Sequence, residues 1–112
     1  MATNQLAGKV ALITGSDSGI GQATAVEFAK EGADIVVNYL NDETGAGQTR
    51  SAVEAEGRQA LVVQCDVSDE HQVEAMFDQT VKRFGTVDIL VNNAGVDASG
   101  KKVAELSTET WD

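Results

Sequence analysis

Short apolar runs alternate with longer amphipathic segments along this chain, and that alternation constrains the fold more than any other feature. Four runs have the length and β-branched content of strands: Val10–Ile13, Asp34–Tyr39, Ala60–Gln64 and residues 88–92. The first run, and residues 89–91 within the last, are continuously apolar, as in parallel strands buried on both faces. Strands that alternate with helices predict an α/β fold, with a right-handed, doubly wound parallel sheet between two layers of helices.

Three amphipathic segments separate the strands and predict helices at 20–30, 42–57 and 69–84. Gly32 and Gly85 follow the first and third segments, in the position of the glycine that ends many helices. The second segment has the thinnest apolar face. We therefore expect its helix to be the most solvent-exposed of the three.

A glycine-rich turn, Thr-Gly-Ser-Asp-Ser-Gly-Ile-Gly at 14–21, lies between the first strand and the first helix. Converging backbone N–H groups at a helix N-terminus supply the positive potential that binds a pyrophosphate. Such a device is needed here, because the formal net charge of −10 repels phosphate. Asp17 opposes a phosphate, so we expect its side chain to face solvent. Glycines can also simply end a strand, but this position within a βαβ unit favours nucleotide binding.

Each small residue of the turn has an expected role. Gly15 permits the tight turn, Gly19 lets the backbone approach the phosphates, and Gly21 lets the helix pack against the sheet. Ser16 and Ser18 can add hydroxyl donors. The turn therefore predicts the dinucleotide-binding end of a Rossmann-like sheet.

Three motifs at successive strand ends resemble the short-chain dehydrogenase/reductase family. The turn has the family's spacing Thr-Gly-x-x-x-Gly-x-Gly, Asn92-Asn93-Ala94-Gly95 matches its Asn-Asn-Ala-Gly motif, and Cys65-Asp66-Val67 ends the third strand where the family places an acid near the adenine. The resemblance covers residues 6–112. It implies an NAD(P)-dependent oxidoreductase that moves hydride between nicotinamide and a small carbonyl or alcohol substrate.

The resemblance implies cofactor contacts at the carboxyl ends of the strands and in the first turn. In this sequence they are Gly15, Ser16, Ser18, Gly19, Ile20, Asn38, Tyr39, Asp66, Val67, Asn93, Ala94 and Gly95. The Asp66 carboxylate would accept a hydrogen bond from the exocyclic amine of adenine. Asn92 would instead be structural and tie its strand end to Thr14.

The choice between NAD and NADP depends on the end of the second strand. A carboxylate there would bind the ribose 2′-hydroxyl and exclude a 2′-phosphate. The region reads Asn38-Tyr39, and Ser18 stands where NADP-preferring relatives often carry a base. The sequence therefore slightly favours NADP or dual use. Asp42 and Glu43 keep NAD open, although both acids also suit the first turn of a helix.

The catalytic serine and Tyr-x-x-x-Lys of the family have no match in this chain. Its one tyrosine, Tyr39, lies on the wrong strand and has no lysine at that spacing, so no catalytic residue is assigned. Residues 107–110 have the composition of a helix start, yet the sequence given stops two residues later, at Asp112. We therefore expect 1–112 to be one NAD(P)-binding domain, truncated before the catalytic half and inactive without the remainder or a complementary chain.

The substrate and assembly rest on the resemblance alone. Residues 36–39, Val-Val-Asn-Tyr, resemble sugar-oxidising members such as glucose 1-dehydrogenases, with 3-oxoacyl-carrier-protein reductases a close second. Relatives are commonly homotetramers, which implies a homo-oligomer. A non-catalytic NAD(P)-binding module stays open as an alternative.

The composition disfavours several other classes. The acidic net charge argues against nucleic acid and anionic membranes as partners. A single cysteine, Cys65, and the lack of an apolar leader predict a cytoplasmic protein without disulfides. Cys65 is expected to be a buried apolar residue and His71 a surface residue, and no cluster has the spacing of metal ligands.

Overall fold

The computed structural model describes residues 5–93 and 108–110, and its element order begins as the sequence predicts. The strands are β1 Val10–Ile13, β2 Asp34–Tyr39, β3 Ala60–Gln64, β4 Ile89–Val91 and β5 Thr108–Thr110. The helices are α1 Gly19–Lys30, α2 Glu43–Ala55 and α3 Glu70–Phe84. Within the described residues, no helix combines the length and the apolar character of a membrane span.

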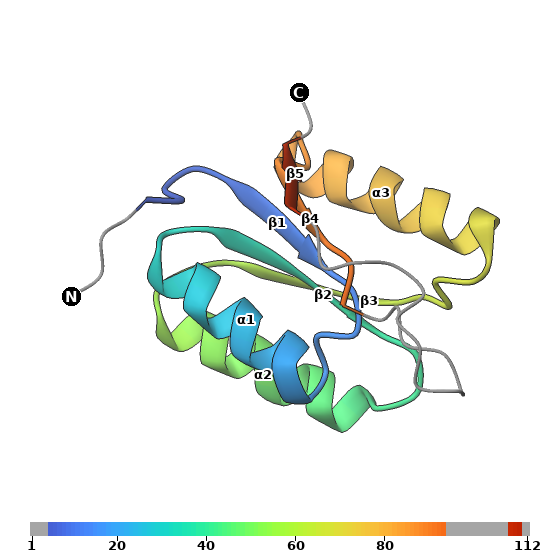
Figure 1. Ribbon diagram of the computed structural model, residues 1–112, viewed down its shortest axis with the longest axis horizontal. Coiled ribbons are helices and arrows are strands. Elements are labelled where there is room, and N and C mark those ends of the chain that lie inside the picture. The colour runs from blue at the N-terminus through green and yellow to red at the C-terminus, as the bar shows by residue number, and fades with distance from the viewer. Residues whose placement is uncertain (1–4, 94–107, 111–112) are drawn as a thin grey trace.

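The strands form one sheet in the order β3-β2-β1-β4-β5, with β1 to β4 parallel. Helices α1 and α2 cover one face of the sheet and α3 covers the other (Figure 1). This confirms the predicted doubly wound, three-layer α/β architecture. All carboxyl ends of the parallel strands meet at one edge of the sheet, where the loops to the helices begin.

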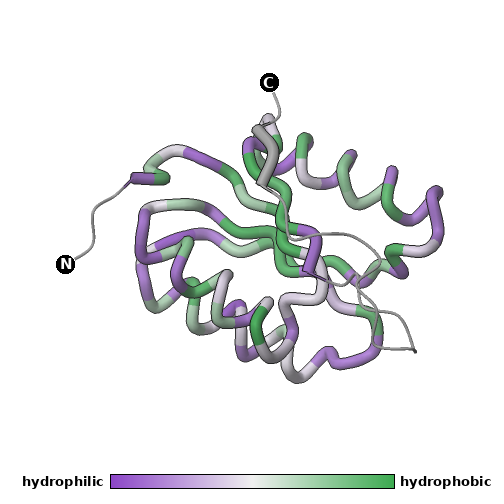
Figure 2. The backbone as a smooth tube through the Cα atoms, viewed as in Figure 1, coloured by the Kyte–Doolittle hydropathy of each residue, from purple (hydrophilic) through white to green (hydrophobic). Residues whose placement is uncertain are grey.

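The apolar strands sit at the centre of the molecule because both of their faces are covered (Figure 2). Side chains alternate between the faces along each strand. Ile13 and Ile35 belong to a core beneath α1 and α2, whereas Leu12 and Val36 belong to a second core beneath α3. A strand buried in this way needs apolar residues at every position, which explains the continuous runs in the sequence.

The exposure of the helices differs from the expectation for α2. Four residues of α2 are buried (Gly45, Ala46, Thr49 and Val53), whereas α3 buries Met76 and Thr80 and leaves Val81 48% exposed. The expectation was wrong because α2 shares a face of the sheet with α1 and packs through small side chains. Among the described helices α3 alone covers the opposite face, so it has no helical neighbour.

Residues 108–110 form a strand rather than the predicted helix start. β5 pairs antiparallel with β4, with Thr108 opposite Val91 and Thr110 opposite Ile89. The backbone groups on the outer edge of β4 provide hydrogen-bond partners for an added strand, and threonine is β-branched.

Helix termination follows the predicted glycines. Gly32 has φ of +101° and Gly85 of +86°, a backbone conformation that other residues rarely adopt. Asp69 caps α3 by accepting hydrogen bonds from the amides of His71 and Gln72. His71 itself is exposed, as expected.

Candidate functional site

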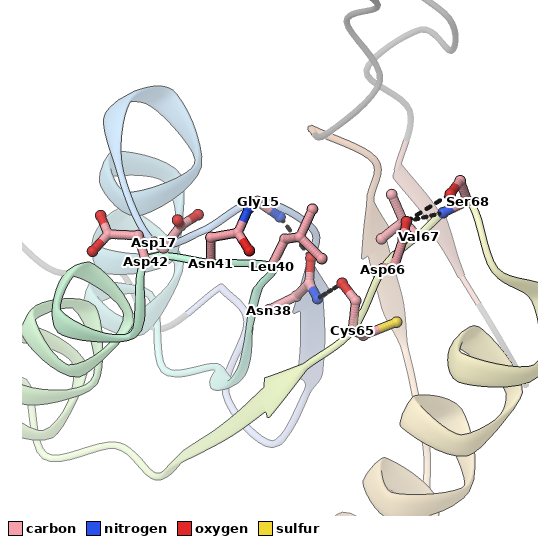
Figure 3. Close-up of a pocket in the computed structure, with 10 residues that line it drawn as sticks. All are labelled: Gly15, Asp17, Asn38, Leu40, Asn41, Asp42, Cys65, Asp66, Val67 and Ser68. Atoms are coloured by element: carbon pink, nitrogen blue, oxygen red, sulfur yellow. Dashed lines mark hydrogen bonds between the residues drawn. The ribbon is translucent and has the colours of Figure 1, made fainter.

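A hollow of about 410 Å³ lies at the carboxyl ends of β1, β2 and β3 (Figure 3). Parallel α/β sheets bind their ligands at this edge. The residues that line the hollow are Gly15, Asp17, Asn38, Leu40, Asn41, Asp42, Cys65, Asp66, Val67 and Ser68. Of the predicted cofactor contacts, Gly15, Asn38, Asp66 and Val67 therefore lie together.

The glycine-rich turn leaves the N-terminus of α1 open. Gly15 and Gly19 have φ of +61° and +56°, so the turn needs glycine at both positions. Ser18 precedes the helix without capping it through its side chain, and a Cβ built at Gly19 would have nothing within 4 Å. First-turn N–H groups have no intrahelical partner. The end of α1 is thus a site that can accept an anion.

Gly21 serves the turn rather than the sheet. A Cβ at this position would collide with the carbonyl oxygen of Gly15 and lie 2.6 Å from Nδ2 of Asn93. The absence of a side chain lets α1 pack directly on the backbone of the turn. The predicted reason for this glycine, packing of the helix on the sheet, is corrected accordingly.

The buried Asn38, on β2, is hydrogen-bonded to the segments that follow β1 and β3, and so joins three strand ends. Its Oδ1 accepts from the Gly15 amide at 2.9 Å, and its Nδ2 donates to the Cys65 carbonyl at 3.1 Å. Its backbone amide donates to Oγ of Ser16 at 3.0 Å. Asn38 touches the hollow, but both polar atoms of its buried side chain already bind the protein, and one of these bonds fixes the turn above β1.

Two predicted cofactor contacts are directed into the protein. Ser16 is fully buried; its hydroxyl donates to the carbonyl of Ile13 at 2.7 Å and accepts from Asn38. Its single hydroxyl hydrogen is therefore not available to a phosphate. Tyr39 is buried in the core beneath α1 and α2, because the alternation along β2 places it on the face of Ile35 and Val37. Both assignments are corrected on these grounds.

The same alternation along β2 explains why Leu40 lines the hollow, although it was not predicted from the sequence as a site residue. Leu40 lies two positions after Asn38, at the end of β2, and it lines the hollow while remaining 48% exposed. A period of two along the strand was the signal that would have favoured Leu40 over Tyr39. Asp17 was expected to face solvent, but it is half-buried and lines the hollow as well.

The Asn92-Asn93 pair holds the turn against β4. Thr14 Oγ1 donates to Oδ1 of Asn92 at 3.3 Å, which confirms the predicted tie. Asn93 donates through its amide to Thr14 at 2.9 Å and through Nδ2 to the Gly15 carbonyl at 3.2 Å. Asn93 thus holds the turn against the end of β4, on the side opposite to Asn38. The predicted contacts Ala94 and Gly95 lie outside the described residues.

Asp66 is half-buried, and its carboxylate is held in a fixed position beyond β3. It accepts from the hydroxyl of Ser68 at 2.6 Å and from the Ser68 amide at 2.9 Å. These hydrogen bonds lower the pKa of Asp66 below its ordinary value. The neighbouring Cys65 is buried, and burial, followed by the charges of Asp66 and Asp69, raises the pKa of its thiol. Cys65 therefore stays protonated and unreactive at neutral pH.

Replacing Ser68 by alanine is expected to raise the pKa of Asp66 toward its ordinary value, because the ionised carboxylate loses its hydroxyl donor. The folded-state pKa is lowered, so the contact stabilises the fold above the unfolded-state pKa and ceases to do so as the pH falls through the folded-state pKa. An NMR titration of the Asp66 carboxyl measures the change. Ser51→Ala, an exposed serine on α2, is the control. An unchanged Asp66 pKa in Ser68→Ala would contradict the role of the hydroxyl.

The comparisons with known proteins agree with this arrangement. Residues 9–112 match the family model of the short chain dehydrogenases. The chain belongs to the short-chain dehydrogenase family. The family's characteristic glycine-rich turn and Asn-Asn pair are thus the segments that the structure brings together above β1 and β4.

Individual members of the short-chain dehydrogenase family match nearly all of the chain. YhdF of Bacillus subtilis, named an uncharacterized oxidoreductase, is 48% identical over 107 residues, 96% of this chain and 37% of the relative. Glucose 1-dehydrogenase 2 of the same organism is 42% identical over 106 residues, 95% of this chain and 41% of the relative. A hydroxysteroid dehydrogenase crystal structure from Escherichia coli aligns with a TM-score of 0.74 at 38% identity, over 80% of this chain and 37% of that one. The chain therefore spans about two fifths of these relatives.

Proposed function

We propose that residues 1–112 form the NAD(P)-binding part of an oxidoreductase that acts on a carbonyl or alcohol substrate. The observation that carries the proposal is the open N-terminus of α1 beside the hollow, in a member of the short-chain dehydrogenase family. When bound, the nicotinamide accepts or supplies the hydride. Every other step that we assign concerns how this chain holds the nucleotide.

The residues fit a dinucleotide in three parts. The turn at Gly15 and Gly19, with the first amides of α1, would hold the pyrophosphate against the acidic field of the molecule. The Asp66 carboxylate, which Ser68 holds in place, and the exposed side chain of Val67 would bind the adenine. Ile20 is 73% exposed at the start of α1 and offers an apolar surface toward the nicotinamide side. Ala94 and Gly95 remain predicted contacts of the ribose edge.

The chain's own residues provide binding and orientation rather than proton transfer. Tyr39 is the one tyrosine of the sequence, and it is buried in the core. A catalytic serine, tyrosine and lysine are therefore proposed for a part of the enzyme other than these residues. A homo-oligomeric assembly and a cytoplasmic location stay predictions from the family resemblance.

Two carboxylates in the hollow support NAD as the preferred cofactor, although the sequence slightly favoured NADP. Asp17 from the turn and Asp42 from the start of α2 lie together at the end of the hollow beside α1 and α2 (Figure 3). Among the residues that the structure describes, no lysine or arginine lines the hollow. A phosphate monoester adds a charge of about −1.5 to −2 at neutral pH. Both acids would therefore repel the 2′-phosphate of NADP. With NAD, a carboxylate could instead accept a hydrogen bond from the free 2′-hydroxyl of the ribose.

The test is a titration of the protein with NADH and with NADPH, followed by nicotinamide fluorescence. We expect NADH to bind at least about tenfold more tightly, a difference of ~1.4 kcal/mol. Asp17→Asn should reduce the difference between the NADH and NADPH affinities. It should do so by strengthening NADPH binding, because one charge that repels the 2′-phosphate is removed. Glu43→Gln is the matched control, since Glu43 is an exposed neighbour of Asp42 that does not line the hollow.

The outcomes separate the parts of the proposal. Equal affinities for the two nucleotides would contradict the NAD preference, and binding of neither would contradict the proposed function. Turnover of the nicotinamide is then measured in a protein that also contains the proposed catalytic serine, tyrosine and lysine, with glucose and with a hydroxysteroid, the substrate classes in the names of two relatives. Tight binding without turnover of any alcohol or carbonyl would favour a non-catalytic nucleotide-binding module.

A further inference from the structure

A buried threonine on α2 is hydrogen-bonded to the glycine-rich turn. Thr49 is fully buried, and its hydroxyl donates to the carbonyl of Ser16 at 2.7 Å. The same hydroxyl accepts from Nε2 of Gln22 on α1 at 2.9 Å. One hydroxyl therefore connects two helices and the turn that precedes the first of them.

This arrangement differs from that of an ordinary helical threonine. Within a helix, threonine usually bonds to the carbonyl four residues earlier, as Thr80 does with Met76 at 2.8 Å in α3. Thr49 also reaches its own such carbonyl, Gly45, but at 3.1 Å rather than the 2.7 Å of the bond to Ser16. A hydroxyl has one hydrogen to donate, and the shorter contact directs it to the turn.

The first turn of α2 supports a second peptide group of the same segment. A Cβ at Gly45 would collide with the carbonyl oxygen of Asp17 and with the carboxylate of Asp42. Glycine thus lets α2 lie directly against the Asp17 carbonyl, next to the Ser16 carbonyl that Thr49 holds. The helix contacts two successive carbonyls of the turn.

The direction of these carbonyls fixes the direction of the amides between them. In a planar trans peptide the C=O and the following N–H point in opposite directions. With the Ser16 carbonyl held toward Thr49, the Asp17 N–H points away from α2. With the Asp17 carbonyl against Gly45, the Ser18 N–H does the same. Both amides belong to the glycine-rich turn at 14–21, the segment that the proposed function assigns to phosphate binding.

We propose that Thr49 is a positioning residue for the cofactor: its hydroxyl orients the peptide groups of the turn so that their amides face the pyrophosphate. The inference rests on the proposed function of the turn and adds α2 to the nucleotide-binding apparatus. Asn38 and Asn93 hold Gly15 from the sides of β2 and β4. Thr49 holds the next residue from the helical layer.

The experiment compares two threonines that are equally buried. Thr49→Val and Thr80→Val each remove one buried hydroxyl with little change of shape, and the Kd for NADH and the unfolding midpoint are measured for both full-length variants. We expect Thr49→Val to raise the Kd about tenfold and Thr80→Val to leave it within about twofold, whereas both lower the midpoint. Thr49→Ser, which keeps the hydroxyl, should restore binding. Amide hydrogen exchange at Asp17 and Ser18 should accelerate in Thr49→Val only.

Several results would overturn the inference. Unchanged NADH affinity in Thr49→Val, or an equal loss in Thr80→Val, means that the hydroxyl contributes only to stability. If Thr49→Val does not fold, Gln22→Met removes the other partner of the hydroxyl at a half-buried position. It should then weaken NADH binding several-fold, and an unchanged Kd refutes the role of the network. Failure of the wild-type protein to bind NADH would refute the proposed function itself.

Discussion

Replacing Gly21 by alanine is expected to destabilise the fold by about 2 kcal/mol and to weaken NADH binding by more than about tenfold. The new methyl group would collide with the Gly15 carbonyl and crowd Nδ2 of Asn93. Overpacking of this kind costs about 1–3 kcal/mol when the neighbours cannot move. The neighbours here are the backbone of the turn and a hydrogen-bonded amide. Relief of the collision therefore has to move α1 away from the turn, and with it the proposed anion site.

The matched control is Gly47→Ala on α2. Gly47 is also helical, but a Cβ there would meet nothing within 4 Å. Alanine is favoured over glycine inside a helix by about 1 kcal/mol, so this variant should be slightly stabilised and bind NADH normally. Denaturant unfolding and NADH titration distinguish the two variants. A stabilised Gly21→Ala with wild-type affinity would show that α1 does not need its close approach to the turn.

Replacing Asn38 by leucine should have a larger effect on stability, a loss of about 2–6 kcal/mol. The substitution keeps the approximate size of the side chain but leaves the Gly15 amide and the Cys65 carbonyl without their buried partner. Each unpaired buried group costs about 1–3 kcal/mol. We expect NADH binding to be lost as well, since the Gly15 peptide is no longer held above β1.

Asn41→Leu is the control for that experiment. Asn41 lines the same hollow but is exposed, and exposed substitutions usually change stability by less than about 0.5 kcal/mol. Denaturant unfolding measures both variants. A small loss in Asn38→Leu, comparable to that of Asn41→Leu, would mean that the three strand ends hold together without the hydrogen bonds of Asn38.

The layers of the fold could be predicted because each depends on a local pattern. Continuous apolar runs such as Val10–Ile13 specify strands covered on both faces, and Gly32 and Gly85 specify where helices end. The relative exposure of α2 and α3 could not be predicted in this way. It depends on which helices share a face of the sheet, and the thin apolar stripe of α2 is buried there through small residues such as Gly45 and Ala46.

The candidate site could be predicted only in part for a similar reason. The motifs placed Gly15, Asp66 and Val67 at strand ends, and all three line the hollow because the strand ends of a parallel sheet converge. The roles of residues with hydroxyl or amide side chains were harder to predict from the sequence. Whether the Ser16 hydroxyl binds a ligand or the protein depends on partners such as Ile13 and Asn38, which only the structure shows. The contact of Thr49 with the turn could not be predicted from a local sequence motif, because its partner Ser16 lies thirty-three residues earlier.

The central place of β1 in the sheet has a consequence for how the protein acquires its affinity for a nucleotide. Gly15, Asn38, Cys65 and Asn93 come from four separate stretches of the chain, and the bonds among them join residues 23 to 78 positions apart. Contacts so distant in sequence carry a larger entropy cost of loop closure than local contacts do. A chain in which these contacts have not formed lacks the site. Any nucleotide that recognises the finished site binds the native state selectively, so dinucleotide concentration and conformational stability are thermodynamically linked.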